Sequence, residues 1–124
     1  MKDGTIDIIT SDHNPIDIEN KKLEFSLAEN GTIGLESFFG VVNSVLDLET
    51  LIQATTSNPR TIFGLESASI EEGQTANLSL FNPQGKSTFS KEHIISTSKN
   101  SAFLGKELTG KAYGSFNNQK LVLA

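Results

Sequence analysis

The chain has 124 residues, of which 36% are hydrophobic and 20% charged, as expected for one globular domain and not for a disordered chain. Its net charge of -5 and the lack of a stretch rich in Lys and Arg exclude a nucleic-acid-binding surface, which needs a basic patch. It contains no cysteine, which excludes disulfides and thiolate metal sites. No apolar run approaches the roughly 20 residues of a membrane span, and the N-terminus has no signal-peptide core. We therefore expect a cytoplasmic protein that binds neither nucleic acid nor membrane.

The first predicted element is a strand over residues 5–10. This stretch is rich in β-branched residues and follows Gly4. The adjacent apolar residues Ile8 and Ile9 favour a strand covered on both faces, as in a parallel sheet. Residues 16–30 then read as a charged loop, with candidate anchors to the core at Leu23, Phe25 and Leu27.

Three helices are predicted before Gly64. The first covers residues 35–46, where apolar residues recur at helical spacing in one stripe: Leu35, Phe38, Phe39, Val42, Val45 and Leu46. The second starts at Asp47, a good N-cap. The third is capped by Asn58-Pro59, with proline at its first position, and ends at Gly64.

The second half of the chain is predicted to be mostly β. A turn at residues 71–73 precedes a strand at 77–81, and a further turn is predicted at 82–85. Residues 90–111 show little regular pattern. The end of the chain predicts a hairpin, 112–116 with 120–123, around Asn117-Asn118. We therefore divide the chain into residues 1–64 (strand, loop and helices) and residues 65–124 (mostly β).

Asp12 and His13 are the first candidate site residues because they directly follow the predicted strand. In α/β barrels the catalytic groups lie at the carboxyl ends of strands, and a carboxylate there can bind a metal or act as a general base. The alternative is structural: Asp12 caps the loop and His13 makes a structural hydrogen bond. The residues alone leave both interpretations open.

Gly31-Thr32-Ile33-Gly34 precedes the first helix, where glycine-rich backbone can hold an anion such as a carboxylate. Its alternative is a loop that needs a positive φ. His93 is interpreted as a surface histidine. With His13 and His93 the only histidines and no cysteine, a self-contained zinc site is not expected.

Several segments, taken in order, resemble the dihydroorotases, members of the cyclic amidohydrolases. Residues 5–15 resemble their last barrel strand and catalytic loop. Glu24-Phe25 with residues 31–36 resembles the E-F…G-x-x-G-L-E segment. The remaining matches are Ser57-Asn58-Pro59 with residues 62–65, residues 73–83, and residues 100–105 with 108–111.

The resemblance implies an α/β to α+β fold: the last βα unit of a TIM-type amidohydrolase barrel, followed by a small β-sheet region. It implies a zinc-dependent enzyme that reversibly cyclises N-carbamoyl-L-aspartate to dihydroorotate in pyrimidine biosynthesis. Asp12 matches the aspartate that binds the metal and shuttles the proton. Asn14 and Gly31 match substrate-contacting positions.

Two departures from the family pattern limit what the chain is expected to do alone. The family's main zinc ligands lie upstream of anything present here, so Met1 is expected to begin a truncated chain that neither binds zinc tightly nor turns over dihydroorotate. We expect it to self-associate or to pair with the missing barrel. The second departure is Ile16, where the family has a histidine that helps bind the substrate carboxylate.

Two further interpretations stay open. The parent protein can be a noncatalytic homologue that serves as a scaffold, with aspartate transcarbamoylase as its partner. The chain can also be an independent β-rich binding module, which the order of the matching segments argues against.

Overall fold

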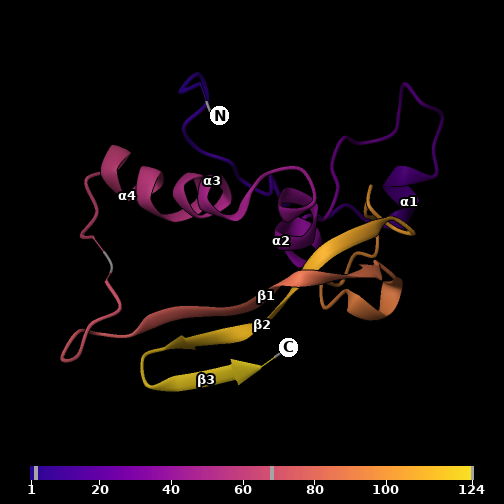
Figure 1. Ribbon diagram of the computed structural model, residues 1–124. Coiled ribbons are helices and arrows are strands. Elements are labelled where there is room, and N and C mark those ends of the chain that lie inside the picture. Colours follow the sequence, from indigo (N-terminus) through magenta and orange to yellow (C-terminus); the bar gives the residue numbers. More distant parts are fainter. Residues whose placement is uncertain (2, 68, 124) are drawn as a thin grey trace.

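The computed structural model of the chain describes residue 1, residues 3–67 and residues 69–123 (Figure 1). The α-helices come first, and a three-stranded antiparallel sheet with the order β1-β2-β3 follows. None of the helices in this part of the chain is long and apolar enough to cross a membrane. The helical elements are α1 (Ile18–Lys21), α2 (Leu35–Asn43), α3 (Leu48–Ile52), the π-helical turn η1 (Gln53–Ser57) and α4 (Asn58–Ile62). The later elements are β1 (Asn77–Thr88), the 3-10 turn η2 (Lys91–His93), β2 (Glu107–Asn117) and β3 (Lys120–Leu123).

All three stretches predicted to be helical contain helix, although α2 ends at Asn43 and not at Leu46, and local signals set the other ends. The Asp47 side chain accepts a hydrogen bond from the Thr50 N–H at 2.9 Å, which confirms the N-cap of α3. Gly64, with φ +64°, follows α4, and the next N–H, that of Leu65, donates to the Arg60 carbonyl at 2.8 Å. This left-handed glycine confirms the predicted end of the helical run.

Asn58 does not cap a separate helix. The chain passes from α3 through η1 into α4 without a break, and Asn58 has helical backbone angles. Its side chain instead donates to the Asp7 carbonyl at 2.8 Å. The predicted cap is therefore wrong, because the residue serves a contact with a distant segment.

Residues 5–10 form no strand, contrary to prediction. A β-strand is stabilised by hydrogen bonds to a neighbouring strand. Among the described residues, no strand pairs with residues 5–10. One backbone bond, from the Ile9 N–H to the Ala54 carbonyl at 3.3 Å, ties the segment to the helices. The small β-sheet region is confirmed, whereas the barrel unit stays a prediction.

The loop over residues 16–30 also differs from its prediction. It contains the single helical turn α1, and the side chains predicted to anchor it are exposed: Leu23 by 51%, Phe25 by 100% and Leu27 by 65%. The anchors are therefore wrong, because apolar residues in a short charged loop bury only if a surface is present to receive them.

The sheet is longer than predicted, because β1 continues through the predicted turn at residues 82–85. Asn82 pairs with Lys111 and Lys86 pairs with Thr109, so four steps along β1 match two along β2. The turn residues form a bulge inside the strand, a position that tolerates proline and glycine. β2 begins within the segment that showed no regular pattern.

The closing hairpin between β2 and β3 is confirmed. Its left-handed turn residues are Asn118 (φ +48°) and Gln119 (φ +60°), one position later than predicted.

The core lies between α2, β2 and the segment around η2. Its buried side chains are Ile33, Phe89, Ile94 and Leu108, with Val41, Phe103 and Leu104 packed against them. The Phe39 ring packs on Phe81 with centroids 4.8 Å apart. This core takes residues from both sides of position 64, and the division into 1–64 and 65–124 stays a prediction.

Gly40 sets how closely α2 approaches β2. A Cβ atom at this buried position would lie 2.9 Å from the Leu108 Cβ. Alanine is better than glycine in a helix by about 1 kcal/mol, but overpacking costs about 1–3 kcal/mol. We expect Gly40→Ala to lower the free energy of unfolding, by up to about 2 kcal/mol, in urea denaturation. A gain in stability would mean that helix propensity outweighs the contact with Leu108.

Candidate functional site

Three segments without regular secondary structure meet beside the N-terminus of α2. They are residues 11–16, 30–34 and 96–102 (Figure 1). The Asn14 N–H donates to the Thr32 carbonyl at 3.0 Å, which joins the first two segments. The structure therefore brings together the two stretches that carry the predicted site residues, and it adds a third.

The third segment contacts both of the others. The Ser98 hydroxyl donates to the Ile16 carbonyl at 2.8 Å. The Ile33 N–H donates to the Asn100 carbonyl at 2.9 Å. Because backbone groups left unpaired in a protein interior are costly, these bonds define how the loops lie.

Asn14 and Gly31, two of the three predicted site residues, are in direct contact. A Cβ atom on Gly31 would lie 2.8 Å from the Asn14 Nδ2 and 2.7 Å from the Ile16 Cγ1. The Asn14 Nδ2 also donates to the Asn30 carbonyl at 3.2 Å. With φ +146°, Gly31 is a position that only glycine fills without displacement, as the loop alternative required.

Asp12, the third predicted residue, is exposed and has a positive φ of 44°. Across residues 1, 3–67 and 69–123, no group of three or more His, Cys, Asp or Glu side chains is arranged to hold a metal ion. A catalytic zinc usually takes three protein ligands, so the side chains of this segment do not fit a complete zinc site. Asp12 could offer only one such ligand.

His13 holds the loop against the start of α2. Its Nδ1 accepts the N–H of Gly34 at 3.1 Å and of Leu35 at 3.2 Å, two groups that a helix N-terminus leaves unpaired. An accepting Nδ1 places the ring proton of a neutral imidazole on Nε2. This geometry fits the structural interpretation of His13.

Glu36 links α2 to the third segment. Its Oε1 accepts the Ser96 N–H at 2.7 Å, and its Oε2 is buried without a hydrogen-bond partner among the described residues. Burial raises the pKa of Glu36, but the hydrogen bonds from Ser96 and from the backbone N–H of Glu36 itself lower it more, so the net pKa lies below the ordinary 4.5. The carboxylate therefore stays charged at the junction of helix and loop.

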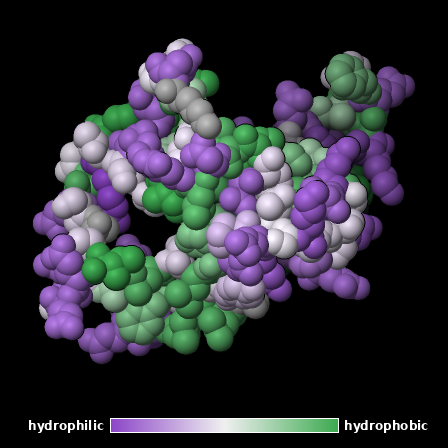
Figure 2. Space-filling model, in the orientation of Figure 1, coloured by the Kyte–Doolittle hydropathy of each residue, from purple (hydrophilic) through white to green (hydrophobic). Residues whose placement is uncertain are grey.

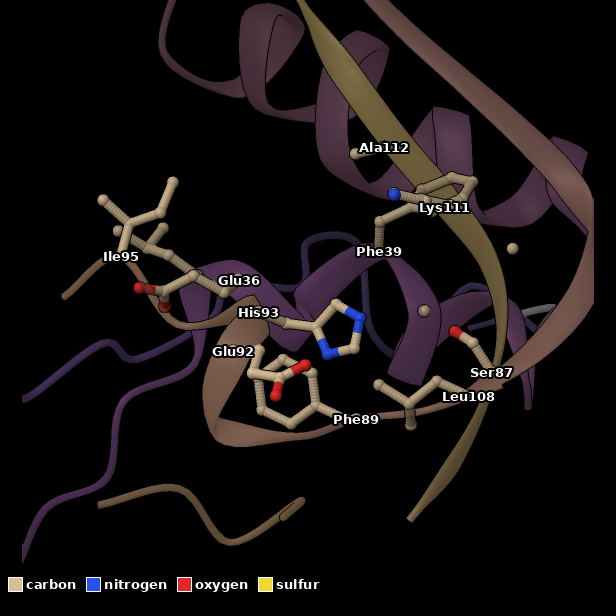
Figure 3. Close-up of a pocket in the computed structure, with 13 residues that line it drawn as sticks. Glu36, Phe39, Ser87, Phe89, Glu92, His93, Ile95, Leu108, Lys111 and Ala112 are labelled. Carbon is tan, nitrogen blue, oxygen red and sulfur yellow. The ribbon is translucent and has the colours of Figure 1, made fainter. Parts of the chain in front are cut away.

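His93, interpreted as a surface histidine, is exposed and stacks on Phe89 with ring centroids 5.9 Å apart. It borders a hollow of about 400 Å³ between α2 and β2 (Figure 3). Apolar side chains such as Phe39 and Leu108 line it together with Glu36. Because its lining contains none of the three predicted site residues, the hollow and the predicted site are separate places.

Sequence reasoning missed the residues that support the site. Lys21 donates to the Gly31 carbonyl at 3.2 Å, and the Asn100 Nδ2 donates to the same oxygen at 3.0 Å. Asn100 begins a stretch with a family resemblance, which was the one available signal. Lys21 belongs to a charged loop and carried none.

Comparison with known proteins shows what the chain is similar to. Residues 1–108 match the model of the amidohydrolase family. The chain is 38% identical to a dihydroorotase of Caldicellulosiruptor saccharolyticus over 98% of its own length and 30% of that protein. It is 36% identical to a dihydroorotase of Geotalea daltonii, again over 98% of this chain and 30% of the relative. The chain thus spans about 30% of the length of these curated relatives.

A solved structure shares the fold of the chain. A D-hydantoinase (dihydropyrimidinase) from Thermus sp. superposes with a TM-score of 0.79 at 25% identity, over 98% of this chain and 29% of that one.

The lowered pKa of Glu36 predicts a pH dependence of stability. A carboxyl group with a depressed folded-state pKa stabilises the fold above its unfolded pKa, and this contribution is lost as the pH falls through the folded-state value. We expect Glu36→Gln to be less stable than the unsubstituted chain at pH 7, with the difference shrinking as the pH drops below 4.5. Urea denaturation between pH 7 and pH 3 measures this difference.

Glu24→Gln, at an exposed glutamate, is the matched control and should keep a constant difference from the unsubstituted chain. If the difference in stability between Glu36→Gln and the unsubstituted chain were also independent of pH, the lowered pKa of Glu36 would be contradicted.

Proposed function

We propose that this chain, which belongs to the amidohydrolase family, provides part of the active site of a dihydroorotase-type enzyme. The reaction is the reversible cyclisation of N-carbamoyl-L-aspartate to dihydroorotate in pyrimidine biosynthesis. The observation that carries the proposal is the contact of Asn14 with Gly31 beside Asp12, in a chain 38% identical to a dihydroorotase. Zinc, which the family resemblance implies, would take its other ligands from outside this chain.

Asp12 is the residue to which we assign the proton transfer. An exposed carboxylate can take a proton from the attacking water in the hydrolytic direction and pass it to the leaving amide nitrogen. The loop bonded to α2 through His13 holds Asp12 in place.

Asn14 and the backbone at Gly31 are assigned to substrate binding. Amide and backbone N–H groups are suitable donors to a carboxylate, which is the charged group of both substrate and product. Ile16 replaces the family's histidine beside them and contributes no donor. Losing a charge-assisted hydrogen bond of this type costs about 1.5–3 kcal/mol, so we expect weak substrate binding.

A chimera tests the proposal. This chain would replace the matching 30% of the Caldicellulosiruptor dihydroorotase, which supplies the rest of the site. We expect the chimera to interconvert N-carbamoyl-L-aspartate and dihydroorotate. Asp12→Asn should lower kcat at least about 100-fold, because a positioned general base contributes about 10²–10⁴.

Asp17→Asn is the control for this substitution, because Asp17 is exposed and its side chain caps no backbone group. It should leave kcat unchanged. Equal activity of the Asp12 and Asp17 variants would refute the assignment of Asp12. A chimera that gains activity only with Ile16→His would favour the noncatalytic scaffold homologue instead.

The chain by itself is expected to self-associate. Large apolar side chains are exposed on it, among them Phe63 (70%), Ile70 (89%) and Ile95 (83%), and Figure 2 shows apolar surface over the sheet. β1 and β3 are the edge strands of the sheet. Such edges and patches drive pairing with other chains. Sedimentation velocity should show dimers or larger species, whereas a monomer at all concentrations would contradict this expectation.

A further inference from the structure

The carbonyl oxygen of Gly31 receives two hydrogen bonds from side chains far apart in the sequence. Lys21 Nζ donates at 3.2 Å and Asn100 Nδ2 at 3.0 Å. The same ammonium group also donates to the Glu29 carbonyl at 2.5 Å. Because a carbonyl oxygen has two lone pairs, these two donors use its whole accepting capacity.

Asn100 also holds the residues that follow Gly31. Its backbone carbonyl accepts the Ile33 N–H at 2.9 Å and the Thr32 hydroxyl at 3.2 Å. The Thr32 hydroxyl oxygen in turn accepts the Ala102 N–H at 2.9 Å. One asparagine therefore fixes both ends of the stretch from Gly31 to Ile33.

Fixing the Gly31 carbonyl also fixes the next N–H. The peptide between Gly31 and Thr32 is planar and trans, so its N–H points opposite to its C=O. Within residues 1, 3–67 and 69–123, the Thr32 N–H has no hydrogen-bond partner. It is a donor of fixed direction in the segment assigned to the substrate.

We propose that Lys21 and Asn100 are positioning residues, which hold the Gly31 carbonyl and so present the Thr32 N–H to a carboxylate oxygen of the substrate. The proposal rests on the proposed function and deepens it by naming the donor and its supports. If the donor is already ordered before the substrate binds, binding does not have to order the loop, and the binding free energy is more favourable.

Hydrogen-exchange mass spectrometry on the 124-residue chain tests the support itself. Lys21→Met removes the ammonium and keeps the stem, and Asn100→Asp keeps the shape but replaces the donor with an acceptor. Each should speed exchange in peptides covering residues 30–35 about 5- to 30-fold, the effect of one or two kcal/mol, while peptides from residues 107–123 keep their rates. Lys21→Arg should restore protection, and Lys22→Met, at the exposed neighbouring lysine, should match the unsubstituted chain.

Unchanged exchange at residues 30–35 in both variants would overturn the proposal. So would an equal rise in the sheet peptides, because the two residues would then only support the fold as a whole.

Kinetics of the chimera test the positioning role. A donor that binds substrate and transition state equally affects KM and leaves kcat unchanged. We expect Lys21→Met and Asn100→Asp to raise KM for dihydroorotate about 5- to 30-fold, with kcat within about twofold of the parent and with recovery in Lys21→Arg. An unchanged KM would overturn the positioning role even if exchange responds. If the unsubstituted chimera is inactive, the proposed function fails, and the exchange experiment alone then decides whether Lys21 and Asn100 hold the loop.

Discussion

The region around Asp12 depends on one constraint. Residues 11–16, 30–34 and 96–102 form no helix or sheet, so backbone N–H and C=O groups that they bury need hydrogen-bond partners elsewhere. The three segments provide these partners for one another, with donors and acceptors as far apart in the sequence as Ser98 and Ile16. Residues 96–102 reach this place because the chain leaves β1, passes η2 and returns as β2 against α2. The close packing of Gly40 on Leu108 is part of the contact between α2 and β2, the strand that follows residues 96–102.

Whether an element depends on local or on distant contacts explains how well the sequence predicts it. Helices α2 and α3 were predicted because their signals are local: an apolar stripe at helical spacing and the Asp47 cap. The hairpin of β2 and β3 was predicted for a similar reason. Residues 5–10 were predicted as a strand, but a strand needs partners, and the described chain offers none. The bulge around Pro83 has the sequence pattern of a turn, because proline and glycine favour both.

In the candidate site, the sequence predicts the proposed functional residues more readily than the residues that hold them in place. Asp12, Asn14 and Gly31 belong to segments with a family resemblance, and the structure brings Asn14 and Gly31 into contact. Their catalytic and binding roles stay predictions. Lys21 acts through its ammonium on two carbonyl groups, a contact that depends on how the whole loop folds and leaves no periodic or spacing signal. The prediction that the loop is anchored fails for the same reason, because whether a side chain is buried depends on which residues surround it in the fold. It concerned Leu23, Phe25 and Leu27.

The backbone at Asp12 has a consequence for which residues this position accepts. A φ of +44° is a conformation that glycine, asparagine and aspartate enter at low cost, whereas β-branched and bulky side chains enter it only with strain. The turn therefore selects for small polar side chains independently of any chemistry. Two of the three residue types that it favours carry a side-chain oxygen that can bind a hard cation, and aspartate alone among them can also take up a proton. The conformation of the backbone and the proposed chemistry therefore favour the same residue at this position, and a mutational scan of stability alone should show that it accepts few residue types.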